Sequence, residues 1–171
     1  MQAAKDSFYM ALRERLSALN PGRTLVIDGV ARPAIIVREN MEPQFIATQA
    51  GVFYIDWGEV QPAESTRPIL GIVCEIRYAS EGSSETGVDR GRVLAQMDDE
   101  LVRICAPPHT GMCDYSQSPS VDLGAGVFWT MPELANTPKE GAGLAQGSAS
   151  PARLERRARL KVYFFVSEVG A

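Results

Sequence analysis

The sequence predicts an α+β fold in which a mostly antiparallel sheet packs against two amphipathic helices. Two segments carry apolar residues at helical spacing, several others alternate between apolar and polar residues, and no clean strand–helix–strand repeat links them. With 171 residues, of which 45% are apolar and 22% charged, the chain has the size and composition of one globular domain. We therefore predict a single domain, residues 1–171, with long protruding loops.

The first expected element is a helix near the N-terminus. Its apolar face consists of residues spaced by four, four and three positions, namely Phe8, Leu12, Leu16 and Leu19. The sequence Asn20-Pro21-Gly22 ends this helix, because proline cannot continue it and glycine accepts a reversed backbone.

Strands are expected to follow. Residues 24–27 and 33–38 flank Asp28-Gly29, a turn-forming pair, and this arrangement predicts a hairpin. Further strands are expected at 52–57, 70–78, 127–131 and 159–169. In the strand at 70–78 the first half is apolar on both faces, which is typical of a strand covered on both sides.

A second helix is expected between a polar loop at 80–87 and Pro107-Pro108. Thr86 and Asp89 have the spacing of a capping box at its start. Its apolar stripe contains Val93, Leu94, Met97, Leu101, Ile104 and Cys105.

Two stretches lack a clear period. Residues 109–123 are predicted to be irregular. Residues 132–152 are rich in Gly, Ala, Ser and Pro, and we expect them to form a flexible insertion.

The charge balance argues against nucleic-acid binding as the main task. The chain has 17 Lys+Arg and 21 Asp+Glu, a net charge of −4, whereas phosphate affinity needs a large cationic surface. No apolar run approaches the roughly 20 residues that span a bilayer, so no membrane partner is expected. Three cysteines without an export signal favour synthesis in a reducing, intracellular compartment.

One candidate metal site combines Cys105, His109 and Cys113, followed by Asp114. Thiolate and imidazole groups bind zinc, and four ligands complete a tetrahedral site. The spacing matches no common zinc motif, however, and Cys105 belongs to the apolar stripe. We expect no metal and no other cofactor, with a small Cys/His metal-binding or catalytic protein kept as an alternative.

The sequence also argues against an enzyme. His109 is the only histidine, no nucleophile motif occurs, and the other titratable residues are scattered. Asp98 and Asp99 are adjacent, but neighbouring residues on a helix diverge by about 100° and do not converge on one ligand.

The most uneven charge feature is a basic run near the C-terminus that includes Arg153, Arg156 and Arg157. The acidic residues Asp98, Asp99 and Glu100 lie away from most of the apolar stripe of the second helix. Both groups are candidates for contacts between subunits, since arginine pairs bidentately with carboxylates. The alternative is that each group is simply solvated.

Five segments together resemble the tail-terminator, or tail-completion, proteins of tailed bacteriophages and phage-like particles. They are FYMALRERLSAL, TLVIDGVARPAIIVREN, ILGIVCEIRYAS, GVDRGRVLAQMDDELVRIC and RLKVYFFVSEV. The resemblance is one of pattern and covers about two thirds of the chain.

The resemblance implies a structural virion protein that assembles in the host cytoplasm and resides in the virion tail. It implies a ring, commonly a hexamer, that caps the tail-tube protein and joins it to the head–tail connector protein. A head–tail adaptor, neck or other tail protein is the alternative within the same class.

Overall fold

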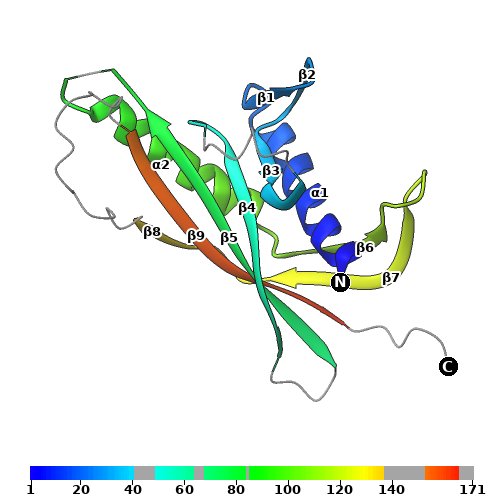
Figure 1. Ribbon diagram of the computed structural model, residues 1–171. Coiled ribbons are helices and arrows are strands. Elements are labelled where there is room, and N and C mark those ends of the chain that lie inside the picture. The colour runs from blue at the N-terminus through cyan, green and yellow to red at the C-terminus, as the bar shows by residue number, and fades with distance from the viewer. Residues whose placement is uncertain (41–48, 64–67, 84, 137–152, 166–171) are drawn as a thin grey trace.

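The computed structural model describes residues 1–40, 49–63, 68–83, 85–136 and 153–165. It has the predicted α+β architecture, with two helices and a mostly antiparallel, curled sheet (Figure 1). Its elements in chain order are α1 (Gln2–Leu19), β1 (Thr24–Ile27), β2 (Val30–Pro33), β3 (Ile35–Val37), the 3₁₀ helix η1 (Arg38–Asn40), β4 (Phe53–Pro62), β5 (Ile69–Glu81), α2 (Val88–Ile104), β6 (His109–Asp114), β7 (Val121–Trp129), β8 (Glu133–Asn136) and β9 (Arg153–Phe165).

The main sheet has the strand order β3-β4-β5-β9-β7-β6, and β8 pairs with β9 beyond the end of β7. Only β3 and β4 run parallel. The centre of the sheet is the antiparallel pair of β5 and β9, which stay in register from Ile69–Phe165 to Glu81–Arg153. Both helices lie on one side of this sheet (Figure 1).

The core forms between the helices and one face of the sheet. Alternation along β5 turns Ile72, Cys74, Ile76 and Tyr78 toward the helices, as the sequence predicts, and all four are buried. The predicted stripe of α1 supplies Phe8, Leu12 and Leu16 to the same core.

The predicted hairpin is only partly correct. Asp28 and Gly29 form its turn with φ angles of 52° and 76°, and positive φ at both positions is what the favoured two-residue hairpin turn requires. The segment predicted as one strand over 33–38 divides, however. Its start completes the hairpin as the end of β2, and its remainder forms β3 beside β4.

The hairpin covers part of the sheet face opposite the helices. There it packs Leu25 and Ile27 against a second, smaller cluster of buried residues: Ala34, Ile36, Val52 and Tyr54. Their neighbours in sequence, such as Ile35 and Phe53, point into the main core. Because strand residues alternate between faces, this division requires a strand at 35–37 that is covered on both sides.

The predicted capping box at the start of α2 is wrong. The residue before the helix is Gly87, which adopts a left-handed φ of 69° and supplies no side-chain cap. Asp89 instead binds the preceding loop, since its Oδ2 accepts a hydrogen bond from the Ser83 amide at 2.9 Å. Glycine at this position accepts a backbone conformation that threonine would strain.

The stretch predicted as irregular over 109–123 contains β6 and the start of β7. Helix α1 covers the outer edge of β6. Ser7 Oγ accepts a hydrogen bond from the Cys113 amide at 2.9 Å, and Arg15 donates to the His109 carbonyl at 2.9 Å. These contacts satisfy backbone groups that an edge strand would otherwise expose.

The last strand begins earlier than predicted, at Arg153 rather than Arg159. Residues 137–152 of the predicted flexible insertion and 166–169 of the predicted last strand lie outside the described residues. Neither helix in the described part of the chain is long and apolar enough to cross a bilayer.

Candidate functional site

The residues of the candidate metal site do not converge. Cys105 is buried in the core, where its carbonyl accepts a hydrogen bond from Trp129 Nε1 at 2.8 Å. His109 is exposed at the start of β6, and Cys113 is half-buried near its end. Among the described residues, no three His, Cys, Asp or Glu side chains gather closely enough to hold a metal ion.

The three thiols differ sharply in their environments. Burial raises the pKa of Cys74 well above its ordinary value, and burial raises the pKa of Cys105 to about 12. Thiolates are the reactive form of cysteine, so both buried thiols are inert in the native protein.

We expect a thiol reagent such as DTNB to modify only Cys113 in the folded protein at pH 8, because only this thiol is accessible. All three cysteines should react in denaturant, and the Cys113→Ser variant should give no native signal and two thiols after unfolding. Rapid native labelling of Cys74 or Cys105 in that variant would contradict the core described above.

The predicted acidic and basic residues are partly paired with each other inside one chain. Arg156 Nη2 lies 2.9 Å from Asp98 Oδ2, and the Tyr78 hydroxyl donates to Asp98 Oδ1 at 2.5 Å. Burial, followed by this hydrogen bond, raises the pKa of Tyr78 far above its ordinary value. The Asp98 carboxylate therefore joins β5, α2 and β9 on the helix-covered side of the sheet.

Glu100 does not lie on the solvent side of α2, contrary to the sequence-based placement. Only 5% of the residue is exposed, and its carboxylate forms an ion pair with Arg23. Asn20 Nδ2 also donates to Glu100 Oε1 at 2.7 Å. Asp99, its neighbour in sequence, is exposed. The proposed role of these acids at a subunit interface stays a prediction.

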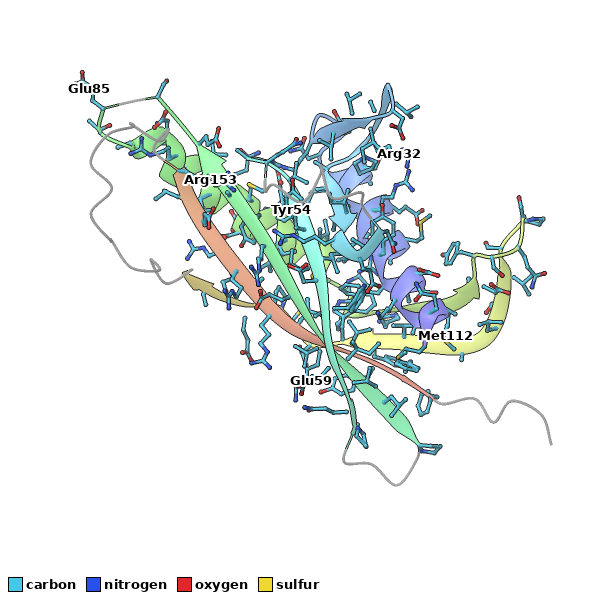
Figure 2. The ribbon with its side chains drawn as sticks, viewed as in Figure 1. Arg32, Tyr54, Glu59, Glu85, Met112 and Arg153 are labelled. Atoms are coloured by element: carbon cyan, nitrogen blue, oxygen red, sulfur yellow. The ribbon has the colours of Figure 1, made fainter. Side chains whose placement is uncertain are left out.

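The sheet face opposite the helices is the most extensive candidate surface. We call it the uncovered face and define it by the outward residues of β5 and β9: Val73, Glu75, Arg77, Arg157, Arg159, Lys161 and Tyr163. Neither helix packs on it: in Figure 2 β5 and β9 pass in front of α2, with Arg153 labelled at the start of β9.

Alternating charges cross this face from η1 to β9. Asp56 lies between Arg38, at 3.7 Å, and Arg77, at 3.5 Å. Glu75 in turn lies between Arg77, at 2.6 Å, and Arg157, at 3.3 Å. We call these five residues the ion-pair ladder. Partial burial raises the pKa of Asp56, while the two adjacent guanidinium groups act in the opposite direction.

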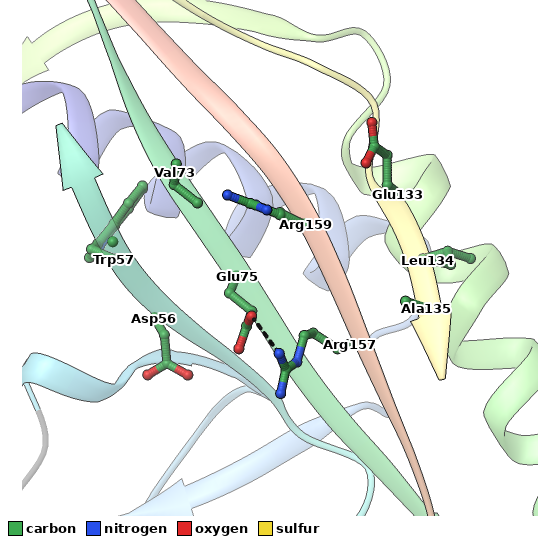
Figure 3. A pocket seen from close by; sticks show the side chains of 10 residues that line it. Asp56, Trp57, Val73, Glu75, Glu133, Leu134, Ala135, Arg157 and Arg159 are labelled. Carbon is green, nitrogen blue, oxygen red and sulfur yellow. Dashed lines mark ion pairs between the residues drawn. The ribbon is translucent and has the colours of Figure 1, made fainter. Parts of the chain in front are cut away.

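A groove of about 620 Å³ runs beside the ladder, with β4 on one side and β8 on the other (Figure 3). Its floor contains Val73 and Glu75 of β5, and Arg157 and Arg159 stand over it from β9. Leu134 of β8 lines the far side and is 39% exposed. Apolar and charged side chains together in one groove are typical of a surface that binds another polypeptide.

A second groove, of about 720 Å³, continues along the same face toward the start of β5 and the end of β9. The Tyr163 ring lies over Gly71, where an added Cβ would come within 3.0 Å of the ring. Phe128 is 45% exposed and meets Phe165 edge to face at 6.3 Å. Aromatic residues are enriched at protein–protein interfaces, so this groove is a candidate binding surface.

Sequence reasoning found part of this surface. The alternation in 159–169 places Arg159, Lys161, Tyr163 and Phe165 on one face of the last strand. It missed the contributions of Phe128 and of β8, because the pairing of those segments with β9 depends on the tertiary fold.

A scan of the sequence against models of known protein families finds no match, and a search among curated proteins finds no significantly similar sequence. The chemistry of the surface itself therefore carries the functional argument. Within the described chain, the acids of the uncovered face are held by arginines in the ion-pair ladder rather than gathered around a reacting centre, which suits binding and positioning of a partner.

Proposed function

We propose that this chain is a tail terminator of a phage-like particle. In this role it is a structural virion protein, without enzymatic activity or a cofactor, that closes into a ring of six copies at the end of the tail tube. One side of the ring contacts the tail-tube protein and the other meets the head–tail connector protein. Assembly takes place in the host cytoplasm, and the mature location is the virion tail.

The observation that carries this proposal is the uncovered face. The described part of the chain leaves a long sheet surface free of helices, with grooves that hold aromatic and arginine side chains. A protein that works through repeated contacts needs such a surface. The resemblance of the five sequence segments to tail terminators is the reason for proposing that this surface makes contacts within a tail-terminator ring.

Termination in this scheme is a matter of surface mismatch. The ring accepts the end of the tube through contacts that copy those of a tube subunit. Its opposite side lacks the surface that recruits another tube ring, so polymerisation stops. Specificity then depends both on the tube end that one side of the ring binds and on the further tube ring that the other side does not bind.

The direct test is to remove the gene and examine particles by electron microscopy. We expect tails of abnormal length that fail to join heads, and normal tails when the wild-type gene is supplied in trans. Tails of uniform, normal length attached to heads in its absence would refute the proposal. Long tubes formed by the purified chain alone would instead assign it as a tube subunit.

A further inference from the structure

The turn end of the hairpin formed by β6 and β7 has the opposite surface character to the uncovered face. We call residues 114–124 the arm. We propose that the arm of one copy docks on the uncovered face of a second copy, a contact that rests on the proposed ring-forming function and identifies the two surfaces that meet.

The arm is apolar and acidic. Three of its side chains are large, apolar and about two-fifths exposed, namely Tyr115 at 39%, Val121 at 42% and Leu123 at 46%. Its sequence contains Asp114 and Asp122 and no lysine or arginine. Val121 and Leu123 share one face of β7, whereas Tyr115 lines a groove with Met10 and Arg13 of α1. Exposed apolar side chains on a projecting hairpin are candidate anchors for a partner.

Local hydrogen bonds give the arm a defined shape before it meets a partner. Ser116 Oγ donates to Asp114 Oδ1 at 2.6 Å, and Gln117 Nε2 donates to Asp114 Oδ2 at 2.9 Å. The Gly124 amide donates to Asp122 Oδ1 at 2.8 Å. Pre-shaping lowers the entropy lost on docking, and the hydrogen bonds from Ser116 and Gln117 lower the pKa of the Asp114 carboxyl.

The uncovered face offers the complementary chemistry. Arg159 and Lys161 project from β9 and make no ion pair with any residue that the structure describes, whereas Arg157 beside them is held by Glu75. Val73 and Tyr163 lie next to these cations and line the grooves. Exposed apolar side chains and two acids on the arm thus match Val73 and Tyr163, with the neighbouring cations Arg159 and Lys161, on the face.

The two surfaces lie at different places on the molecule. In Figure 1 the arm projects beyond β7 on the side away from β8, whereas the first groove is lined by residues of β4, β5, β8 and β9. A contact between two different surfaces is heterologous. Each added copy offers a new arm and a new face, so the contact propagates and closes when the rotation per copy permits a ring.

Disulfide trapping between two proteins that each carry one introduced, accessible cysteine tests this geometry; Cys74 and Cys105 remain buried in both. Both proteins are full-length and carry Cys113→Ser; one has Leu123→Cys on the arm and the other Val73→Cys on the face. After mixing and mild oxidation, we expect a mixed disulfide dimer. The matched control pairs the Leu123→Cys protein with an Arg92→Cys protein, because Arg92 is exposed on α2 behind the sheet.

We expect the arm–face mixture to give about tenfold more mixed dimer than the control mixture, since a specific contact raises the local thiol concentration. Equal yields in the two mixtures would overturn the proposal. It would also be overturned if most dimers were linked through the cysteines introduced by Leu123→Cys in two copies, because the arm would then contact another arm.

A charge exchange tests the electrostatic part. Asp122→Lys and Arg159→Glu should each weaken self-association about tenfold in sedimentation, and combining them in one chain should restore it. Asp122→Asn is the matched control, because it removes the charge and keeps a side-chain oxygen for Gly124. Equal losses in the single and combined variants would count against direct pairing.

The outcomes separate this contact from the proposed function. Defective tails without the gene, together with control-level disulfide yields, would keep the terminator role and discard the arm–face contact. Normal tails without the gene, together with specific disulfides, would discard the role and keep the contact.

Discussion

Replacing Glu100 with alanine is expected to lower the free energy of unfolding by about 3–5 kcal/mol, because removing one partner of a buried ion pair leaves the other charge uncompensated. The side chains of Glu100 and Arg23 are only 7% and 12% exposed. Arg23 also donates to the Gly51 carbonyl at 3.2 Å, so it holds the loop before β4 against α2. The urea midpoint of the variant, measured by circular dichroism, gives the change directly.

Asp99→Ala provides the matched control. Asp99 is adjacent in sequence and exposed on α2, so its loss should alter stability by no more than about 0.5 kcal/mol. Similar midpoints for Glu100→Ala and Asp99→Ala would show that the buried pair contributes no more than a surface charge. Arg23→Ala should lower the free energy of unfolding as much as Glu100→Ala does, because it leaves the buried Glu100 carboxylate without its guanidinium partner.

The same pair illustrates what could not be predicted from the sequence. Glu100 and Arg23 are 77 positions apart, and they meet because the end of α1 returns the chain to the middle of α2. In the sequence, Glu100 follows two aspartates and looks like part of a solvated helix face. Local periodicity predicts which residues share a face of a helix, but not which charged side chain of another segment packs against that face.

The elements that were predicted well are those with a strong period. Alternation fixed β5 and most of β9, because both strands bury one face against the helices. The strand β6 was missed because Met112 is its only fully buried residue, so no alternation appears in the sequence. Its edge is stabilised instead by Ser7 and Arg15 of α1.

The candidate surface was predictable to a similar degree. Outward-facing Arg159 and Lys161 follow from strand alternation alone. The pairing of Arg156 with Asp98, and of Arg157 with Glu75, does not, since both depend on which strand and helix lie beside β9. Intramolecular pairing leaves fewer of the basic side chains for partners than the sequence indicates.

Phe8→Ala is expected to cost about 3–5 kcal/mol, the range for removing a buried phenylalanine from a core. Phe8 is fully buried, and its ring meets Trp57 at 5.6 Å and Trp129 at 5.1 Å, both edge to face. It thereby joins α1 to β4 and to β7 on the two sides of the central strands. A loss of this size is a large share of the 5–15 kcal/mol typical of a domain.

Circular dichroism in urea is the appropriate measurement, because both tryptophans contact Phe8 and their native fluorescence will also change. If the alanine variant does not fold, Phe8→Leu can replace it, because leucine keeps most of the apolar volume. The leucine variant should then unfold at a lower urea concentration than the wild type. A Phe8→Ala midpoint close to that of the wild type would mean that the contact of α1 with the sheet is not central to the core.

Phe128→Ala is the matched comparison, since it removes the same side chain from the uncovered face. Phe128 is 45% exposed, so its loss should lower the free energy of unfolding by less than about 1 kcal/mol. Phe128 lines the second groove, where we expect its ring to contact a partner, because aromatic residues are enriched at protein–protein interfaces. Phe8→Ala should therefore destabilise the isolated chain, whereas Phe128→Ala should weaken self-association and leave the chain folded.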